Sequence, residues 1–73
     1  MELYNNLGGK SSVSQYEIQE DRILIVFKNS KEIYIYPEYL TGSEHFQNLK
    51  SRATKGSGLG AYIMNNVKDK FIK

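Results

Sequence analysis

Two segments of this chain carry large apolar side chains at consecutive positions, and this pattern constrains the fold most. Residues 23–27 read Ile-Leu-Ile-Val-Phe, and residues 33–36 read Ile-Tyr-Ile-Tyr. Successive side chains of a β-strand point to opposite faces, so each segment predicts a strand that is apolar on both faces. Such a sheet needs a cover on both faces. Helices can supply one layer, so the N-terminal segment, a second copy or a partner must cover the other face, and we expect the N-terminal segment to do so.

The composition limits the class of protein. With 73 residues the chain is expected to form one domain, and the absence of cysteine excludes a disulfide, a thiolate nucleophile and a sulfur-ligated metal site. Residues 1–7 lack the basic start and apolar core of a signal peptide. No apolar segment approaches the roughly 20 residues that cross a bilayer. We therefore expect a cytoplasmic protein without membrane contact.

The strand patterns predict an antiparallel meander. We expect its three strands at residues 13–18, 22–28 and 31–36. Asn29-Ser30 fits a two-residue hairpin loop, because asparagine tolerates a positive φ. Pro37 should end the third strand, since proline has no N–H to donate to a sheet.

The period becomes helical after Pro37. Ser43 fits an N-cap, and Gly56 fits the end of this first helix because glycine can adopt the left-handed conformation. A second helix is predicted by an apolar stripe formed by Leu59, Tyr62, Ile63, Asn66, Val67, Lys70 and Phe71. The whole chain therefore predicts an α+β fold of order β-β-β-α-α, with both helices on one face of the sheet. We expect residues 1–10 to form an N-terminal tail and residues 11–73 to form the domain.

Charge is distributed unevenly along the chain. Residues 1–45 carry a net charge of −3, from four basic and seven acidic side chains, whereas residues 46–73 carry +5, from six basic and one acidic. A basic surface can contact the phosphates of a nucleic acid, although a solvated helical surface has the same composition. The candidate phosphate contacts are Lys50, Arg52, Lys55, Lys68 and Lys70.

Tyr34 and Tyr36 share one face of the third predicted strand. Aromatic rings displayed by a sheet can stack with single-stranded bases. The alternative is that both rings pack under the helices, and we favour it because large side chains must fill that space. In that case Leu24, Val26, Ile33 and Ile35 form an outer face suited to protein contact.

The glycine turn Gly56-Ser57-Gly58 precedes a predicted helix and is a candidate anion site. Free N–H groups and the helix dipole favour anions at such a point. The turn lacks the pattern of a P-loop or a dinucleotide fold, so a plain connection between two helices is the more frequent outcome.

No set of residues predicts catalysis or metal binding. His45 is the single histidine and has no cysteine partner, so a structural or surface histidine is expected. No acid is placed to orient its ring toward a nucleophile. We therefore expect a protein that is not an enzyme and that carries no metal and no cofactor.

Several of these features together resemble the KTSC domain. They are Ser11-Ser12 before the first strand, Tyr34 and Tyr36 in the third, Phe46 and Leu49 in a helix, and a glycine turn before a last helix ending in an aromatic residue. This family is named for its place at the C-terminus of some lysyl-tRNA synthetases and also occurs as a stand-alone bacterial or phage protein. The resemblance covers about residues 11–71. Pro37 directly after Tyr36 and the long turn at residues 55–60 depart from the family's pattern.

The resemblance implies one small α+β fold, no established activity and a proposed role in RNA binding. Together with the charge asymmetry, it favours a small binding module for RNA or tRNA that uses the basic helical surface. The alternative is a protein-interaction or self-association module, with a protein partner or a second copy on the apolar sheet face or an edge strand.

Overall fold

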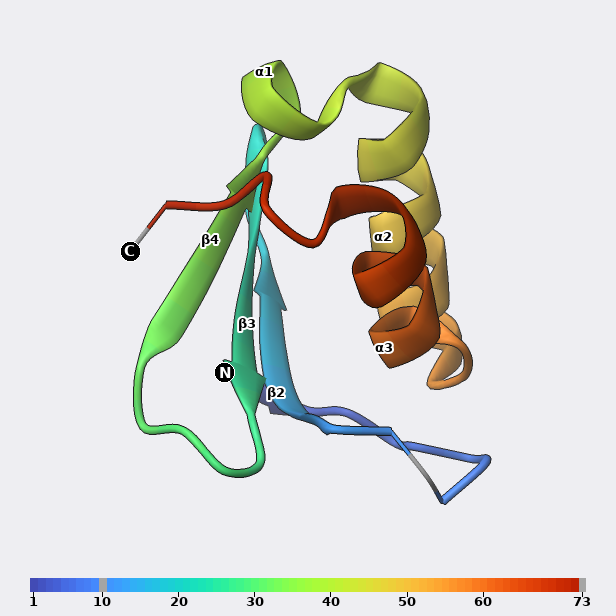
Figure 1. Cartoon of the computed structure of the whole chain (residues 1–73). Coiled ribbons are helices and arrows are strands. Elements are labelled where there is room, and N and C mark those ends of the chain that lie inside the picture. Colours follow the sequence, from blue (N-terminus) through green and yellow to red (C-terminus); the bar gives the residue numbers. More distant parts are fainter. Residues whose placement is uncertain (10, 73) are drawn as a thin grey trace.

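The computed structural model describes residues 1–9 and 11–72. Within these residues the chain forms an α+β domain with one antiparallel sheet of four strands in the order β1-β2-β3-β4. The strands are β1 (Glu2–Leu3), β2 (Val13–Ile18), β3 (Arg22–Phe27) and β4 (Ile33–Pro37). The helices are α1 (Glu38–Thr41), α2 (Ser43–Lys55), α3 (Leu59–Tyr62) and the π-helical η1 (Ile63–Val67). The two longest helical segments, α2 and α3 with η1, lie on the same side of the sheet (Figure 1).

The three strands predicted from alternation are confirmed as β2, β3 and β4. The prediction of three strands in total is wrong, because β1 adds a fourth at the edge. Glu2 and Leu3 pair with Tyr16 and Gln15 of β2. A strand of two residues is too short to show an alternating pattern, so the sequence gives no local signal for it.

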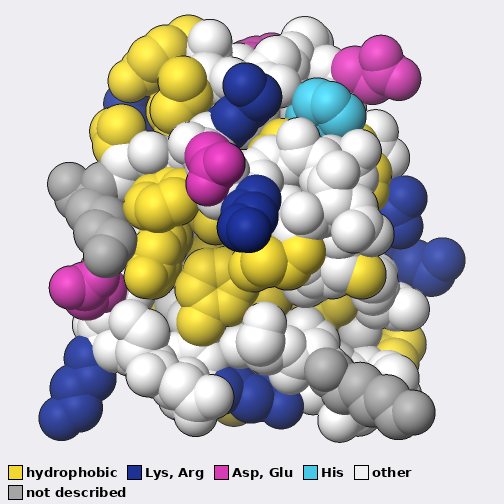
Figure 2. Space-filling view, viewed as in Figure 1, with side chains coloured by type: hydrophobic (Ala, Val, Ile, Leu, Met, Phe, Trp, Pro, Cys, Tyr) yellow, Lys and Arg dark blue, Asp and Glu magenta, His cyan; other side chains and the backbone are white. Residues whose placement is uncertain are grey.

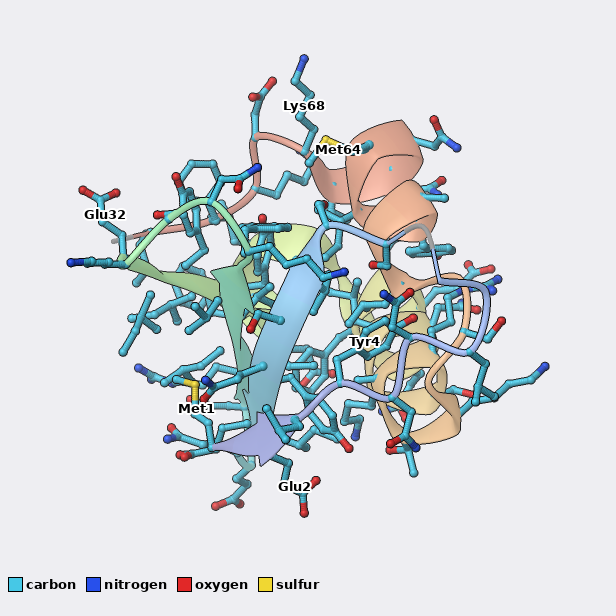
Figure 3. The ribbon with its side chains drawn as sticks, turned by 90° about the horizontal axis from the view of Figure 1, so that it is seen from below. Met1, Glu2, Tyr4, Glu32, Met64 and Lys68 are labelled. Carbon is cyan, nitrogen blue, oxygen red and sulfur yellow. The ribbon has the colours of Figure 1, made fainter. Side chains whose placement is uncertain are left out.

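The N-terminal segment does not cover the second face of the sheet, and that expectation is wrong. After β1, the Tyr4 N–H donates to the Ser14 carbonyl at 3.0 Å, and the Tyr4 ring is buried on the helical side. The Leu59 N–H donates to the Tyr4 hydroxyl at 3.1 Å. Figure 3 shows Tyr4 turned toward the helices. The segment therefore completes the core between sheet and helices.

The connection between β3 and β4 is longer than the predicted two-residue loop. Val26 and Ile33 form the last pair of the two strands, and residues 28–32 connect them. The Ser30 N–H donates to the Phe27 carbonyl at 3.1 Å, and the Glu32 N–H donates to Ser30 Oγ at 3.1 Å. These bonds stabilise a wider loop. Asn29 does not adopt the positive φ expected for the two-residue turn, because Asn6 is the only described non-glycine residue with a positive φ.

A glycine flanks helix α2 at each end. Gly42 occupies the N-cap position without a side-chain cap, so the prediction of Ser43 as the cap is wrong; Ser43 is the first helical residue. The end at Gly56 is confirmed, with a φ of 81° and an N–H that donates to the Arg52 carbonyl at 2.9 Å. Left-handed glycine at this position satisfies a carbonyl of the last turn.

The last predicted helix is shorter than its apolar stripe. Leu59, Ile63 and Val67 are buried as predicted, but the helical structure ends at Val67. Beyond it, Ile72 forms an antiparallel bridge with Ile35, with two backbone hydrogen bonds of 2.8 Å. Phe71 consequently packs on the sheet from an extended segment instead of a helix.

The core lies between the inner face of the sheet and the helices. The sheet contributes Val13, Tyr16, Ile23, Ile25 and Tyr36, and the helices contribute Phe46, Leu49, Ala53, Leu59, Ile63 and Val67. Tyr4 completes it. The core side chains of β2, β3 and β4 therefore all belong to one face of the sheet.

Candidate functional site

Tyr34 and Tyr36 face the helices. Tyr36 pairs with Ile23 and Tyr34 pairs with Ile25, and both isoleucines are buried in the core. Tyr36 is 1% exposed, so its ring is not displayed for base stacking on the surface. The packing alternative is the one that the structure shows. The opposite faces of β3 and β4 consequently carry their other side chains outward.

Two rows of outward side chains carry the apolar groups of this face, next to a third outward pair, Arg22 and Pro37, at the end of β3 and β4. One row, in register from edge to edge, is Leu3, Gln15, Val26 and Ile33. The other is Glu17, Leu24, Ile35 and Ile72. We call these eight residues the outer sheet face. Six of the eight side chains are apolar. Five of them are contiguous over β3, β4 and the bridge at Ile72, and the sixth, Leu3, lies on β1 beyond Gln15.

The outer sheet face is not covered by any segment within residues 1–9 and 11–72. Leu3 is 75% exposed, Ile33 43% and Ile72 40%, while Leu24, Val26 and Ile35 are half-buried by their neighbours in the sheet. Glu17 on β2 is the charged residue of the two rows, and Arg22 of the adjoining pair points to the same side of the sheet. The face thus has an apolar centre and a polar margin.

A second candidate site lies at the hairpin end of the inner face, where aromatic rings cluster. The Phe27 and Tyr34 ring centroids are 5.2 Å apart at an interplanar angle of 80°. Phe71 approaches Tyr34 at 4.8 Å and Tyr36 at 5.7 Å. The edge-to-face and tilted contacts between these rings are favourable arrangements for aromatic pairs and fix the orientations of the rings.

This cluster borders a hollow of about 400 Å³, which we call the aromatic pocket. Its lining comprises Ser12, Phe27, Asn29, Ser30, Tyr34, Tyr36, Met64, Lys68, Asp69 and Phe71. Figure 2 shows hydrophobic side chains gathered in the middle of this side of the molecule, with charged groups of both signs beside them. Figure 3 shows Lys68 projecting outward beside Met64. The pocket thus joins an aromatic floor to a polar and charged rim.

Burial raises the pKa of the Tyr36 hydroxyl to about 12, with a smaller contribution from Tyr34. Unfolded tyrosine titrates near pH 10, so between these values the unfolded chain loses this proton first. We expect this contribution to stability to be full below about pH 10 and to decrease by about 2 kcal/mol by about pH 12. Urea unfolding of the wild type and of Tyr36→Phe at several pH values tests this. Equal pH dependence in the two proteins would contradict it.

The five predicted basic residues fall into three groups. Lys50 and Lys55 border a shallow hollow along α2, Lys68 and Lys70 border one after η1, and the Arg52 guanidinium lies 4.6 Å from the Tyr62 ring centroid. Lys50 also has its ammonium 4.9 Å from the Phe46 ring centroid. Of these five, only Lys68 lines the aromatic pocket together with Tyr34 and Tyr36. RNA binding by a continuous basic helical surface stays a prediction.

The turn Gly56-Ser57-Gly58, predicted as an anion site, contacts the N-terminal segment. A Cβ atom on Gly56 would lie 2.6 Å from the Asn5 Cβ, and the Leu7 N–H donates to the Gly56 carbonyl at 2.8 Å. The first N–H of α3, at Leu59, is bonded to the Tyr4 hydroxyl. The Tyr4 hydroxyl therefore accepts from the α3 N–H that an anion was expected to bind.

His45 has a structural contact that the sequence did not predict. Its Nδ1 shares a hydrogen bond of 2.6 Å with the Tyr62 hydroxyl. The Arg52 guanidinium lies over the same ring, and its Nε is buried without a hydrogen-bond partner among the described residues. These contacts hold α2 against α3. His45 and Tyr62 are 17 positions apart, and no local sequence pattern links residues at that separation.

Other site types have no counterpart among residues 1–9 and 11–72. No group of three or more His, Cys, Asp or Glu side chains there could hold a metal ion. The helices in the same residues are too short or too polar to cross a membrane. Comparisons with models of protein families, with curated proteins and with solved structures found no match. The resemblance to the KTSC domain therefore stays a prediction.

Proposed function

We propose that this chain is a small non-catalytic binding module that associates with a second copy of itself through the outer sheet face. The observation that carries this proposal is the uncovered apolar centre formed by Leu24, Val26, Ile33, Ile35 and Ile72. Contiguous apolar surface of this kind on a small domain is a mark of an interaction site. The consecutive apolar residues of β3 and β4, which constrain the fold, thus also form the surface on which the proposed function depends.

The arrangement of the face suits sheet-on-sheet packing. Two sheets pack about 10 Å apart, with the side chains of their facing surfaces interdigitating. Branched side chains in two register rows provide such a surface, as one half of a β-sandwich does. Gln15 and Glu17 on β2 border the apolar centre, which matches the usual anatomy of an interface with an apolar core and polar groups around it.

The charge of the face favours a protein over a nucleic acid. Glu17 is the only charged side chain in the two rows, and the cation of the adjoining Arg22 is paired with Asp21 at 3.0 Å, so the face offers no net positive charge to phosphates. An apolar patch requires no opposite charge on its partner, so it is complementary to itself. Two copies related by a two-fold axis present the same residues to each other, and this closes the pair.

Replacing Ile33 with glutamate tests the proposal. Each copy would then place an unpaired carboxylate against apolar side chains, so we expect self-association to weaken by at least roughly 30-fold. Sedimentation equilibrium from about 10 µM to about 1 mM would measure the association constant. Ile33 is itself partly exposed, so the fold should persist in the variant.

The matched control is Leu7→Glu, because Leu7 is also highly exposed but lies outside the two rows. This variant should associate like the wild type. A wild-type protein that stays monomeric at about 1 mM would overturn the proposal, as would equal association constants for Ile33→Glu and the wild type.

A further inference from the structure

We propose that the aromatic pocket binds a single nucleotide, with the base against the aromatic floor and the phosphate at Lys68. This site is separate from the outer sheet face, since its lining comes from the inner face, the β3–β4 loop and the C-terminal segment. The two sites could therefore operate in the same molecule. The inference replaces a basic helical surface that contacts RNA with one pocket that holds one base.

The size and floor of the pocket suit a flat ring. A hollow of about 400 Å³ falls in the range of small-molecule sites, roughly 300–1,000 Å³. Phe27 and Tyr34 meet at an interplanar angle of 80°, so they form a corner with two aromatic walls. Phe71 is tilted against Tyr34 by 59° on the side of the C-terminal segment. A planar base can contact such walls by stacking and by edge-to-face packing.

The margin of the pocket carries groups that can recognise the edge of a base. Asn29 offers an amide with both donors and an acceptor, and Ser12 and Ser30 offer hydroxyls. Ser30 is held in place because its N–H donates to Phe27 and its Oγ accepts from Glu32. The wide β3–β4 loop thus places polar groups where a two-residue hairpin turn would not. Bases are read through such contacts in unpaired RNA.

The charges at the rim select the form of the phosphate. Lys68 supplies a cation that can pair with a phosphate oxygen, and Asp69 beside it supplies an anion. The two charges cancel, so the rim does not attract a highly charged polyphosphate. A phosphate with one negative charge, such as the diester in a strand, is the better match.

The experiment is a titration of isotope-labelled protein, followed by the amide and aromatic signals. The probes are the four ribonucleoside monophosphates, short single-stranded ribonucleotides of three residues, and inorganic phosphate as the ligand without a base. We expect shifts at Phe27, Asn29, Ser30 and Phe71 with the nucleotides and none at these residues with phosphate alone. We expect tighter binding of the trinucleotides, because their internal phosphates are singly charged diesters; equal binding would identify a free nucleotide as the source of the base.

Lys68→Gln should weaken nucleotide binding roughly tenfold and lower its salt dependence. Lys70→Gln is the matched control, because Lys70 is two residues away and does not line the aromatic pocket. Its affinity should equal that of the wild type. The proposal is overturned by an absence of shifts with every nucleotide at millimolar concentration, by equal shifts with inorganic phosphate, or by equal losses in the two lysine variants.

Discussion

Replacement of Phe46 by alanine is expected to remove most of the stability of this domain. Phe46 is 1% exposed and lies between α2 and the sheet within the single core. Truncation of a buried phenylalanine costs about 3–5 kcal/mol, through lost apolar burial and the cavity that remains. A domain of this length has a free energy of unfolding of roughly 4–11 kcal/mol. One substitution therefore takes a large share of the total.

Urea unfolding followed by circular dichroism measures this effect. The control is Tyr39→Ala, which removes an aromatic ring that is 77% exposed on α1 and should change the free energy of unfolding by less than about 0.5 kcal/mol. A loss below about 1 kcal/mol for Phe46→Ala would show that the helices do not pack on the sheet as the structure has them.

The second large effect is expected at Tyr4, which connects the N-terminal segment to the core. Tyr4→Ala empties a buried position and leaves the Leu59 N–H without its acceptor, so we expect a loss of about 3–5 kcal/mol. Tyr4→Phe keeps the ring and removes only the hydroxyl. Its expected loss is about 1–3 kcal/mol, the cost of one buried unsatisfied N–H. Thermal or urea unfolding of both variants gives the two values.

Leu3→Ala is the matched control for Tyr4→Ala. It changes the neighbouring residue in the same segment, but the Leu3 side chain is 75% exposed, so stability at low protein concentration should hardly change. Hydrogen exchange at Leu59 adds an independent measurement, because its protection should decrease in Tyr4→Phe. Unchanged stability in Tyr4→Ala would mean that the N-terminal segment is not docked on the core.

The fold was predictable where a local pattern reports it. Alternation located β2, β3 and β4, and the left-handed glycine at position 56 ended α2 as expected. The fourth strand was not predictable, because two residues carry no period and Tyr4 bonds to a residue 55 positions away. The last helix was predicted to extend past Val67, where the structure ends it. Phe71 is apolar and fits the helical stripe, but the same property allows it to pack on the sheet from an extended segment.

The candidate sites were predictable in part. The alternation of faces along a strand correctly divided the side chains of β3 and β4 into an inner and an outer set. The need for large side chains between sheet and helices correctly placed the tyrosines under the helices. Periodicity alone is silent on which set meets the helices, since both sets are apolar. The aromatic pocket depends on Phe71 reaching Tyr34, a contact across 37 positions, and on a loop whose length was predicted wrongly.

The way the sheet ends at its two sides bears on aggregation. β1 pairs over only two residues, and on the other side Ile72 occupies the hydrogen-bonding groups of Ile35, while Pro37 offers no N–H. Sheets that grow edge to edge need a long row of free backbone groups, and they can grow into fibrils. Among the described residues neither side offers such a row. Growth along the sheet is therefore discouraged, and the proposed contact through the outer face would stop once two molecules have met.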